Sequence, residues 1–172
     1  MFSRDEPDFN VISVRNSAPG MLENIRTLLQ QNNLGMDDDI EQFVVACSGR
    51  RVIGCAGLVS NTIKCVAVAC DWRGENLSAR LLGEVENLAV QRGNFHLFLY
   101  TRPGNAERFR GCGFYPIVQW DDVAVLMENT PVGISHYCRS LQRHLHHGQR
   151  IGAVVMNANP FTLGHRYLAE QA

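Results

Sequence analysis

The strongest constraint in this sequence is a short stretch in which a strand has to run directly into a helix. The β-rich run TIKCVAVAC, at 62–70, is followed by the polar turn DWRGEN and then, from Leu77, by apolar residues at helical spacing. The first N–H groups of such a helix have no partners within it and lie at the positive end of its dipole. We therefore predict a turn that can hold an anionic pyrophosphate through backbone amides.

The segments around this turn predict an α/β (α+β) domain built on a mostly antiparallel sheet. The acidic stretch at 36–42 is expected to be a loop or a short helix. The run FHLFLYT is apolar at almost every position, so we expect this strand to be buried on both faces. Helices are predicted in 21–34, from 77 onward and in 105–111, and strands in 9–16, in 43–61 (two, joined by a tight turn at Ser48-Gly49), in 62–70, in 95–101 and in 122–128.

Composition excludes several classes of protein. The chain has 172 residues, a hydrophobic content of 45% and a formal net charge of -1, so a strongly basic nucleic-acid-binding protein is excluded. No apolar run approaches the roughly 18 residues of a membrane span, and no secretory signal opens the sequence, so we expect a cytoplasmic protein. The six cysteines include no C-x-x-C pair and are expected to be buried, reduced thiols: Cys47, Cys55, Cys65, Cys70, Cys112 and Cys138.

The end of the chain differs in character from the rest. Residues 131–149 predict a polar, basic linker helix, and 150–172 read as a hydrophobic strand, a turn and the start of a helix. Such a short piece cannot bury its own apolar faces, so we expect it to belong to a second domain of a longer protein. Without its partners this piece is expected to be mobile or to pair with a neighbouring chain. The predicted division is therefore a domain at 1–130, a linker at 131–149 and a partial domain at 150–172.

Two motifs in the first domain resemble those of the GNAT acyltransferase superfamily. One is the stretch from Val68 to Ser78, similar to the pyrophosphate loop, and the other is NAERFRGCGF at 105–114, which ends in Gly-Phe. The resemblance implies a GNAT-like fold in which one strand offers backbone groups to pantetheine, the loop holds the pyrophosphate and an asparagine lies near the pantetheine. The residues so implied are Val66, Ala67 and Val68 for the strand, Arg73, Gly74, Glu75, Asn76, Leu77 and Ser78 for the loop, and Asn105.

The sequence departs from that family at three positions. Asn76 and Ser78 stand where the family usually has smaller residues, but asparagine tolerates positive φ, so we expect the loop conformation to be kept. Phe109 stands where many members have a tyrosine that protonates the departing thiolate, and phenylalanine has no proton to donate. No general base is evident beyond Glu75 and Glu84 on the following helix. A competent acetyltransferase, a CoA-like binding module and a scaffold without chemistry all remain open.

A second motif follows the apolar run IGAVVM. In NANPFTLGH, Gly164 lets a phosphate approach the backbone, and His165 can hydrogen-bond a phosphoryl oxygen and stabilise a leaving pyrophosphate. The stretch resembles the (His/Thr)-x-Gly-His signature of nucleotidyltransferases, which implies a Rossmann-like domain that binds nucleotide. His136, His144, His146 and His147 lack a regular ligand spacing, so no metal site is expected. The nucleotide-binding residues so implied are Asn157, Asn159, Thr162, Gly164 and His165, the last also catalytic.

Together the two motifs resemble the citrate (pro-3S)-lyase ligase family, essentially from end to end of this chain. That family uses ATP with Mg²⁺ to adenylate acetate and then acetylates the thiol of the prosthetic group, a dephospho-CoA derivative, on the citrate lyase acyl carrier subunit. The resemblance implies that the first domain recognises CoA, acetyl-CoA or that CoA-like arm. Adenylation needs more phosphate and Mg²⁺ contacts than this chain contains, so we expect it to be inactive as a ligase. An N-acetyltransferase that uses acetyl-CoA and a non-catalytic docking domain are the alternatives.

Overall fold

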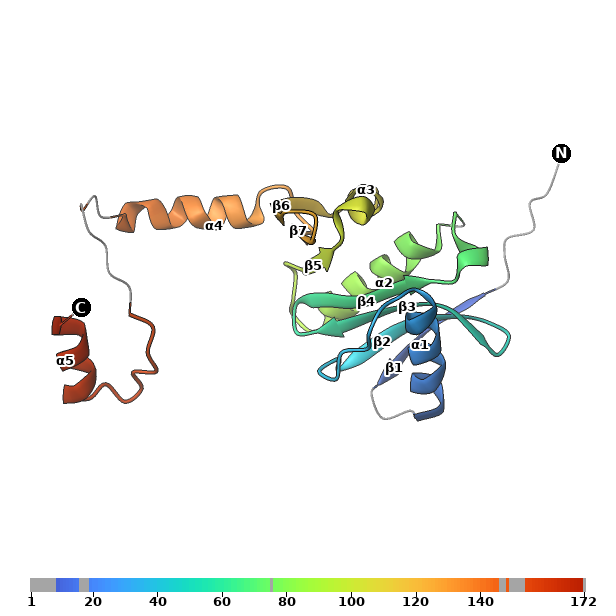
Figure 1. The fold of residues 1–172 in the computed structure, drawn as a ribbon, viewed down its shortest axis with the longest axis horizontal. Coiled ribbons are helices and arrows are strands. Elements are labelled where there is room, and N and C mark those ends of the chain that lie inside the picture. Colours follow the sequence, from blue (N-terminus) through green and yellow to red (C-terminus); the bar gives the residue numbers. More distant parts are fainter. Residues whose placement is uncertain (1–8, 16–18, 75, 146–147, 149–153, 172) are drawn as a thin grey trace. The chain divides into compact units, whose positions relative to one another are not determined.

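The computed structural model of this chain describes residues 9–15, 19–74, 76–145, 148 and 154–171. Within this part, seven strands form one sheet in the order β1-β2-β3-β4-β5-β7-β6 (Figure 1). All neighbouring strands are antiparallel except β4 and β5, which confirms the predicted mostly antiparallel sheet. The strands are β1 (Asn10–Arg15), β2 (Gln42–Ser48), β3 (Arg51–Val59), β4 (Thr62–Val68), β5 (Phe98–Thr101), β6 (Tyr115–Trp120) and β7 (Ala124–Glu128).

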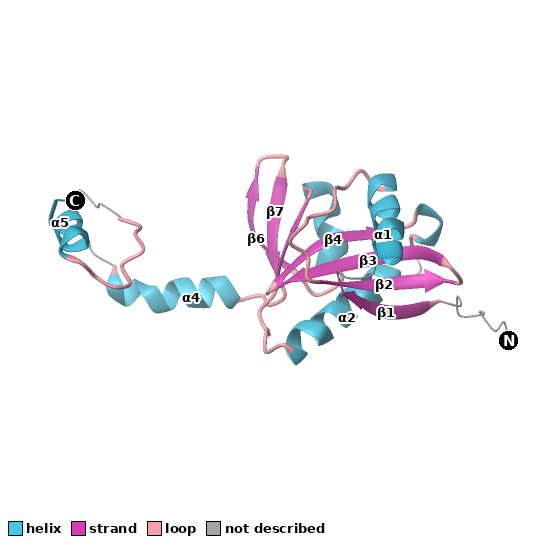
Figure 2. Ribbon diagram, turned by 90° about the horizontal axis from the view of Figure 1, so that it is seen from below, coloured by secondary structure: helices cyan, strands magenta, loops and turns pink. Residues whose placement is uncertain are grey.

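Two helices cover the two faces of this sheet, α1 (Pro19–Gln31) and α2 (Leu77–Gln91), as Figure 2 shows. The central strand β3 is consequently buried at every position from 52 to 58. Gly54 permits the close approach of α2, because a Cβ at this position would lie 2.7 Å from Cδ1 of Leu81. The amphipathic patterns that predicted both helices are thus confirmed, and they exist because each helix buries one apolar stripe against the sheet.

The region after α2 departs from the predictions in two respects. The apolar stretch at 95–101 forms only the short strand β5, and Phe95 and Tyr100 are 71% and 65% exposed, so the predicted burial on both faces is wrong. Strand β6 was not predicted at all. It lies at the edge of the sheet with most of its side chains exposed, so its sequence lacks the alternation by which a half-buried strand is recognised.

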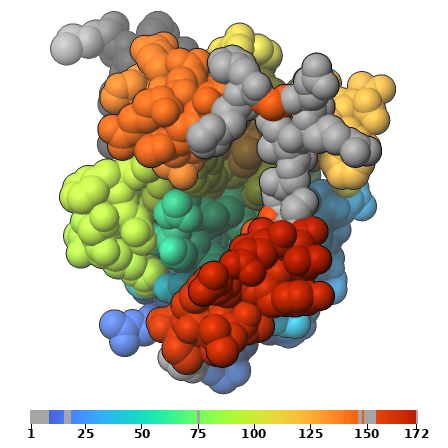
Figure 3. All heavy atoms as spheres, turned by 90° about the vertical axis from the view of Figure 1, so that its left-hand side faces the viewer, coloured from blue at the N-terminus to red at the C-terminus, as the bar shows by residue number. Residues whose placement is uncertain are grey.

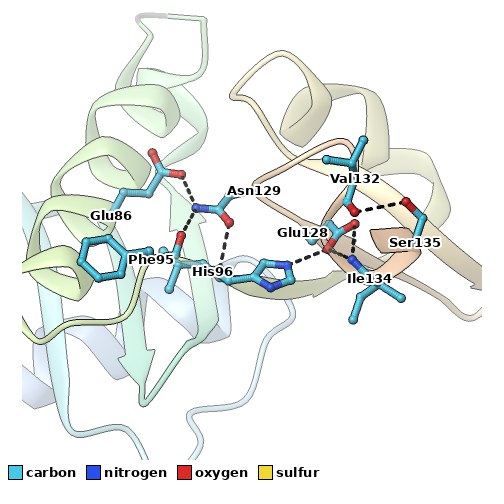
Figure 4. A network of polar contacts seen from close by, with 9 residues as sticks. Glu86, Phe95, His96, Glu128, Asn129, Val132, Ile134 and Ser135 are labelled. Atoms are coloured by element: carbon cyan, nitrogen blue, oxygen red, sulfur yellow. Dashed lines mark hydrogen bonds and ion pairs between the residues drawn. The ribbon is translucent and has the colours of Figure 1, made fainter. Parts of the chain in front are cut away.

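Helix α4 (Gly133–Leu141) begins at a buried carboxylate on strand β7 (Figure 4). Glu128 is only 4% exposed, and its Oε2 lies 2.6 Å from Nε2 of His96. The same oxygen accepts the N–H of Ile134, in the first turn of α4, at 2.9 Å. A Cβ on Gly133 would lie 2.5 Å from both the carboxylate and the imidazole. The start of α4 is therefore fixed by contacts that only a glycine permits.

The chain divides into two compact units, residues 1–135 and 136–172. The second contains most of α4, a 3-10 turn η3 (Gln142–His144) and α5 (Leu163–Gln171), and none of its described residues is buried. Helix α5, red in Figure 3, follows the predicted turn as expected. The preceding strand is not formed by the described residues 154–156, whereas 150–153 lie outside the described part. A strand needs a neighbour for its N–H and C=O groups, and no described segment pairs with this one.

The six cysteines are free thiols with different surroundings. Burial raises the pKa of Cys55 to about 12. Cys70 and Cys138 are exposed, so the prediction of buried thiols is wrong for these two, which lie in a turn and on an unpacked helix. In the part of the chain that the structure describes, no helix is both long enough and apolar enough to cross a membrane.

Candidate functional site

Strand β4 contains an irregularity at its centre. Lys64 pairs with Gly57 and Ala67 pairs with Cys55, so two residues of β4, Cys65 and Val66, lie opposite a single residue of β3. Cys65 has a positive φ of 52°. This is a β-bulge, which bends a strand and increases its local twist. The bulge thus includes Val66 and directly precedes Ala67 and Val68, the residues implied to offer backbone groups to pantetheine.

The bulged strand separates from its parallel neighbour. Strands β4 and β5 pair only through Thr62 with Phe98 and Ile63 with Leu99, although β4 continues to Val68. Beyond Ile63, the backbone of β4 therefore has no β5 partner among the described residues. An extended molecule inserted between the two strands could hydrogen-bond to these groups as a strand does. We call this opening, from Lys64 to Val68 on β4, the strand gap.

Asn105 lies at the same edge of the sheet as the end of the strand gap. Strand β5 ends at Thr101 and leads through the 3-10 turn η2 (Pro103–Asn105) into α3 (Ala106–Arg110). Because β4 and β5 are parallel, their carboxyl ends meet at one edge. The fold thus brings Val68 and Asn105 to one edge, although they are far apart in sequence.

The turn after β4 has the backbone conformation expected for an anion-binding loop. It contains a 3-10 turn η1 (Cys70–Trp72), then Gly74 with φ 100° and Asn76 with φ 56°, so Asn76 adopts the positive φ that asparagine tolerates. Glu75 lies outside the described residues. Asn76 is the N-cap of α2 but makes no side-chain cap, and Arg80 is the first residue whose N–H reaches a helical carbonyl, that of Asn76.

The amides of Leu77 and Ser78 therefore lie outside the hydrogen-bond ladder of α2. The side chain of Leu77 is buried in the core, so its backbone alone is available to a ligand. Ser78 is half-buried. The pyrophosphate-binding prediction thus rests on backbone groups at the positive end of a 15-residue helix.

Contacts from distant parts of the chain hold this turn in place. Arg51 on β3 donates two hydrogen bonds to Asp71, at 2.6 and 2.9 Å, and lowers the pKa of that carboxyl. Trp72 packs edge-to-face on Phe9, with ring centroids 5.8 Å apart. The guanidinium of Arg80 lies 4.4 Å from the centroid of the same Phe9 ring. A preorganised turn loses little conformational freedom when a ligand binds.

Arg73 is bound within the protein. Its Nη2 donates to Oδ1 of Asn32, just after α1, at 2.8 Å. Sequence reasoning missed Asn32, Arg51 and Asp71 because contacts over such separations leave no local signal. Arg73 therefore helps to fix the turn, and its guanidinium would have to leave Asn32 to bind a phosphate with the same atom.

Phe109, Glu86 and Glu84 do not provide a proton-transfer group at the strand gap. Phe109, on α3, packs against the core and has no hydroxyl. Burial raises the pKa of Glu86, but Asn129 donates to its carboxylate and also to the carbonyl of Phe95, before β5 (Figure 4). Glu86 thus lies at the end where β4 and β5 are still paired. Glu84 is exposed and lines a shallow cavity with Val11, Ile12 and Ser13 of β1.

Two shallow cavities lie elsewhere in the described part of the chain. One is the cavity between β1, β2 and α2, and the other lies between α1 and the β2–β3 hairpin. None of the predicted binding residues lines either of them. The strand gap is an opening between two strands, and its binding groups are backbone atoms. Binding through such groups does not require a closed pocket.

The second predicted site is local to the turn before α5. The N–H of Thr162 donates to Nδ1 of His165 at 3.0 Å, and the hydroxyl of Thr162 lies 2.8 Å from the same nitrogen. Gly164 is exposed between them, and Asn157 and Asn159 are exposed in the preceding turn. The structure brings Thr162 and His165 together, and places Gly164 in the first turn of the helix, where its amide is free of the helical ladder.

Comparison with protein families matches both parts of the chain. The model of the acetyltransferase (GNAT) family matches residues 11–114. The model of the citrate lyase ligase C-terminal domain matches residues 151–172. The first match contains the strand gap and the turn before α2, and the second contains the NANPFTLGH motif.

Curated relatives named citrate (pro-3S)-lyase ligase match most of this chain. The protein of Klebsiella pneumoniae is 47% identical over 150 residues, which is 87% of this chain and 44% of that protein. The protein of Escherichia coli (strain K12) is 42% identical over 159 residues, 92% of this chain and 45% of that protein. The chain thus spans less than half the length of the curated relatives that it matches.

Solved structures share the fold at low sequence identity. ElaA of Escherichia coli has a TM-score of 0.62 at 13% identity, with 72% of this chain and 100% of that chain covered. An aminoglycoside 6'-N-acetyltransferase complexed with coenzyme A has a TM-score of 0.59 at 13% identity, covering 69% of this chain and 95% of that chain. These likenesses show the fold of the first unit.

Proposed function

This chain belongs to the acetyltransferase (GNAT) family, and from that premise we propose that it is the N-terminal part of a citrate (pro-3S)-lyase ligase. The observation that carries the proposal is the 42–47% identity to such ligases over 86–92% of this chain, across both units. The whole enzyme would use ATP and acetate to acetylate the prosthetic-group thiol of the citrate lyase acyl carrier subunit, with AMP as a product. We place this reaction in the cytoplasm.

Within that enzyme, we assign the first unit to recognition of the CoA-like arm of the carrier. On the β5 side, β4 has no partner among the described residues at Val66, Ala67 and Val68, and its backbone there would offer donors and acceptors to the amide groups of a pantetheine. The amides of Leu77 and Ser78 would hold the pyrophosphate. CoA, acetyl-CoA and a dephospho-CoA derivative all carry these two features, so the residues present fit the group.

The absence of a phenol at position 109 supports recognition of the arm over acetyl transfer from CoA. A GNAT-type transfer releases a thiolate that needs a proton, and the phenyl ring of Phe109 is packed against the core. A ligase that delivers acetyl to the thiol of the arm instead needs that thiol held in place. Binding by backbone groups satisfies this requirement without a proton donor at position 109.

We assign the second unit to the nucleotide, with Gly164 and His165 at the phosphates of ATP. The first turn of α5 presents backbone amides, which suit phosphate oxygens. Bound Mg²⁺ would neutralise charge on the phosphates. Adenylation would draw on further residues of the ligase, so we expect residues 1–172 alone to be inactive as a ligase.

An N-acetyltransferase that uses acetyl-CoA is the second candidate, because the acetyltransferase match covers residues 11–114. Such an enzyme would turn over acetyl-CoA with an amine acceptor in the absence of ATP. Release of free CoA thiol with a panel of amines distinguishes this candidate. Turnover above the uncatalysed rate would favour it over the ligase proposal.

Calorimetric titration with dephospho-CoA, CoA, acetyl-CoA and ATP tests recognition of the arm. We expect dephospho-CoA to bind at least as tightly as CoA. Ala79→Glu places a carboxylate in the first turn of α2. The helix dipole stabilises a negative charge at this position, so the helix is kept, but the carboxylate repels a pyrophosphate. We expect this variant to weaken dephospho-CoA binding about tenfold or more, because the like charges meet at the helix terminus.

Asn87→Glu is the matched control, since it adds the same charge to an exposed position on the same helix. Its affinity for dephospho-CoA should equal that of the unmodified chain. If no thiol ligand binds the unmodified chain, the first unit is a scaffold and the arm-recognition proposal is wrong. If a non-catalytic docking domain is correct instead, the acyl carrier subunit will bind while CoA and dephospho-CoA do not.

A further inference from the structure

The geometry around α5 points to a role for Thr162 that differs from direct contact with the nucleotide. We propose that Thr162 is a positioning residue, which fixes the tautomer of His165 so that the ring presents its Nε2–H to the phosphate oxygens of ATP. This inference rests on the proposed function for its ligand. The contact between Thr162 and His165 itself involves only residues within one helical turn and does not depend on the ligand.

Thr162 and His165 exchange hydrogen bonds in both directions. The backbone N–H of Thr162 donates to Nδ1 of His165 at 3.0 Å, and the N–H of His165 approaches Oγ1 of Thr162 at 3.5 Å. Thr162 is the residue before α5, and His165 is the third residue of the helix. The pattern is that of a capping box, in which histidine takes the place of the usual glutamate or glutamine.

This exchange determines which ring nitrogen carries the proton. A backbone N–H can only donate, so Nδ1 of His165 has to accept and cannot itself bear a hydrogen. The threonine hydroxyl, 2.8 Å from the same nitrogen, can also donate to it. In the neutral imidazole the proton is therefore on Nε2, which is turned away from Thr162.

The tautomer matters because phosphate oxygens accept hydrogen bonds and do not donate them. With its proton on Nδ1, a neutral histidine would present a lone pair to the phosphate and repel it. With its proton on Nε2, the same neutral ring is a donor, at the helix end where the amides of Leu163 and Gly164 also lie outside the ladder. Thr162 thus prepares a donor without a proton being taken up.

Two other contacts restrict the imidazole and the start of the helix. The ring of Phe161 is tilted by 31° to that of His165, with centroids 5.8 Å apart. The N–H of Arg166 donates to the carbonyl of Thr162 at 3.1 Å, which begins the helical ladder. The N–H, hydroxyl and carbonyl groups of Thr162 are thereby all used within the cap. This is why the structure assigns Thr162 to positioning, while Gly164 and His165 remain the groups that face the ligand.

The tautomer is measured directly by ¹⁵N chemical shifts of labelled histidine in the 172-residue chain, near neutral pH and without nucleotide. We expect His165 to give the signature of the Nε2–H tautomer. Thr162→Val keeps the backbone N–H and the shape of the side chain but removes the hydroxyl that caps the helix and contacts Nδ1. Without this cap the first turn frays, the backbone N–H leaves Nδ1 part of the time, and the tautomers should mix. Thr162→Ser keeps the hydroxyl and should restore the signature of the unmodified chain.

The functional readout is the KM for ATP of the full-length ligase that the proposed function implies. Thr162→Val should raise this KM about tenfold and Thr162→Ser should leave it within about twofold, since about tenfold corresponds to one lost donor interaction. His165→Gln keeps a capping-box side chain at this position but removes the imidazole donor without adding a charge, so it should retain α5 and raise the KM for ATP about tenfold. A merely structural role of His165 would leave the KM for ATP unchanged in this variant.

Two results would overturn the proposal. One is an Nδ1–H signature for His165 in the unmodified chain, and the other is an unchanged tautomer in Thr162→Val. A third result separates this inference from the function on which it rests. If the tautomer follows Thr162 as expected but the full-length protein does not use ATP, the ligase proposal fails and the positioning of His165 by Thr162 stands.

Discussion

The first unit and the segment after it obey the same local rules but differ in burial. In the first unit, α1 and α2 each bury an apolar stripe against the sheet, and β3 is buried from 52 to 58. In the second unit, no described residue is buried, and Val155 is 100% exposed. The second unit nevertheless forms α5 with a complete capping box. A motif made of neighbouring residues can therefore form without a core.

Helices and strands respond differently to this lack of burial. A helix satisfies its backbone groups within itself, apart from its ends, which a capping box can complete. A strand has to find a second strand, and the described residues 154–156 have none. The NANPFTLGH motif therefore keeps the local geometry of Thr162 and His165 although the described residues 154–156 before it form no strand.

Shortening one large apolar side chain in each unit should reveal the difference in burial most strongly. Leu81→Ala removes a fully buried side chain of α2 that packs against Gly54, and should lower the free energy of unfolding by about 2–5 kcal/mol. Leu141→Ala, on exposed α4, should change it by less than about 0.5 kcal/mol. Urea denaturation followed by circular dichroism measures both. Equal losses would mean that α4 is packed as tightly as α2.

The start of α4 belongs to the first unit and provides a second test of how burial affects stability. Glu128→Ala leaves the N–H of Ile134 and the ring of His96 without their partner, so it should cost roughly 1–3 kcal/mol and speed amide exchange in the first turn of α4. Glu107→Gln, at an exposed position, is the control and should do neither. Unchanged exchange in Glu128→Ala would show that α4 does not depend on the carboxylate.

The thiols of the two units should differ in how strongly they make stability depend on pH. Burial raises the pKa of Cys55 from 9.0 to about 12, so its thiol stays neutral in the folded chain while the unfolded chain ionises. The resulting stability is complete below pH 9.0 and declines as pH rises toward 12, by about 1 kcal/mol at pH 10. Denaturation curves of Cys55→Ala should show a smaller decline, because burial also raises the pKa of Cys47, Cys65 and Cys112. Cys138→Ala, in the second unit, should keep the full decline, and equal declines in both variants would assign it to other groups.

Exposed ion pairs should affect neither unit. Asp71→Asn breaks the pair with Arg51, and Glu170→Gln breaks the 2.7 Å pair with Arg166. Both pairs are solvent-exposed, where screening and side-chain entropy offset the attraction. We expect thermal melting midpoints within experimental error of the unmodified chain. A clear shift for Asp71→Asn alone would indicate that the turn before α2 depends on this pair.

Periodicity predicted α1, α2 and most of the strands, because burial of one face imposes a regular pattern on the residues. It failed for β6, an edge strand with exposed side chains, and for Phe95 and Tyr100. Their run was apolar enough for a central strand, but β4 pairs only with the first two residues of β5. Whether a partner strand continues beside an apolar run is a property of distant residues.

The candidate sites also differ in whether neighbouring or distant residues determine them. The turn at Gly74 and Asn76 could be predicted from local sequence, because it depends on the backbone geometry of neighbouring residues. The capping box of Thr162 and His165 is equally local but was not predicted, because histidine stands where the usual signature has glutamate or glutamine. The strand gap could not be predicted from local sequence. It exists because the bulge at Cys65 turns β4 away and because β5 is short, and only packing of the complete sheet settles which backbone groups are left unpaired.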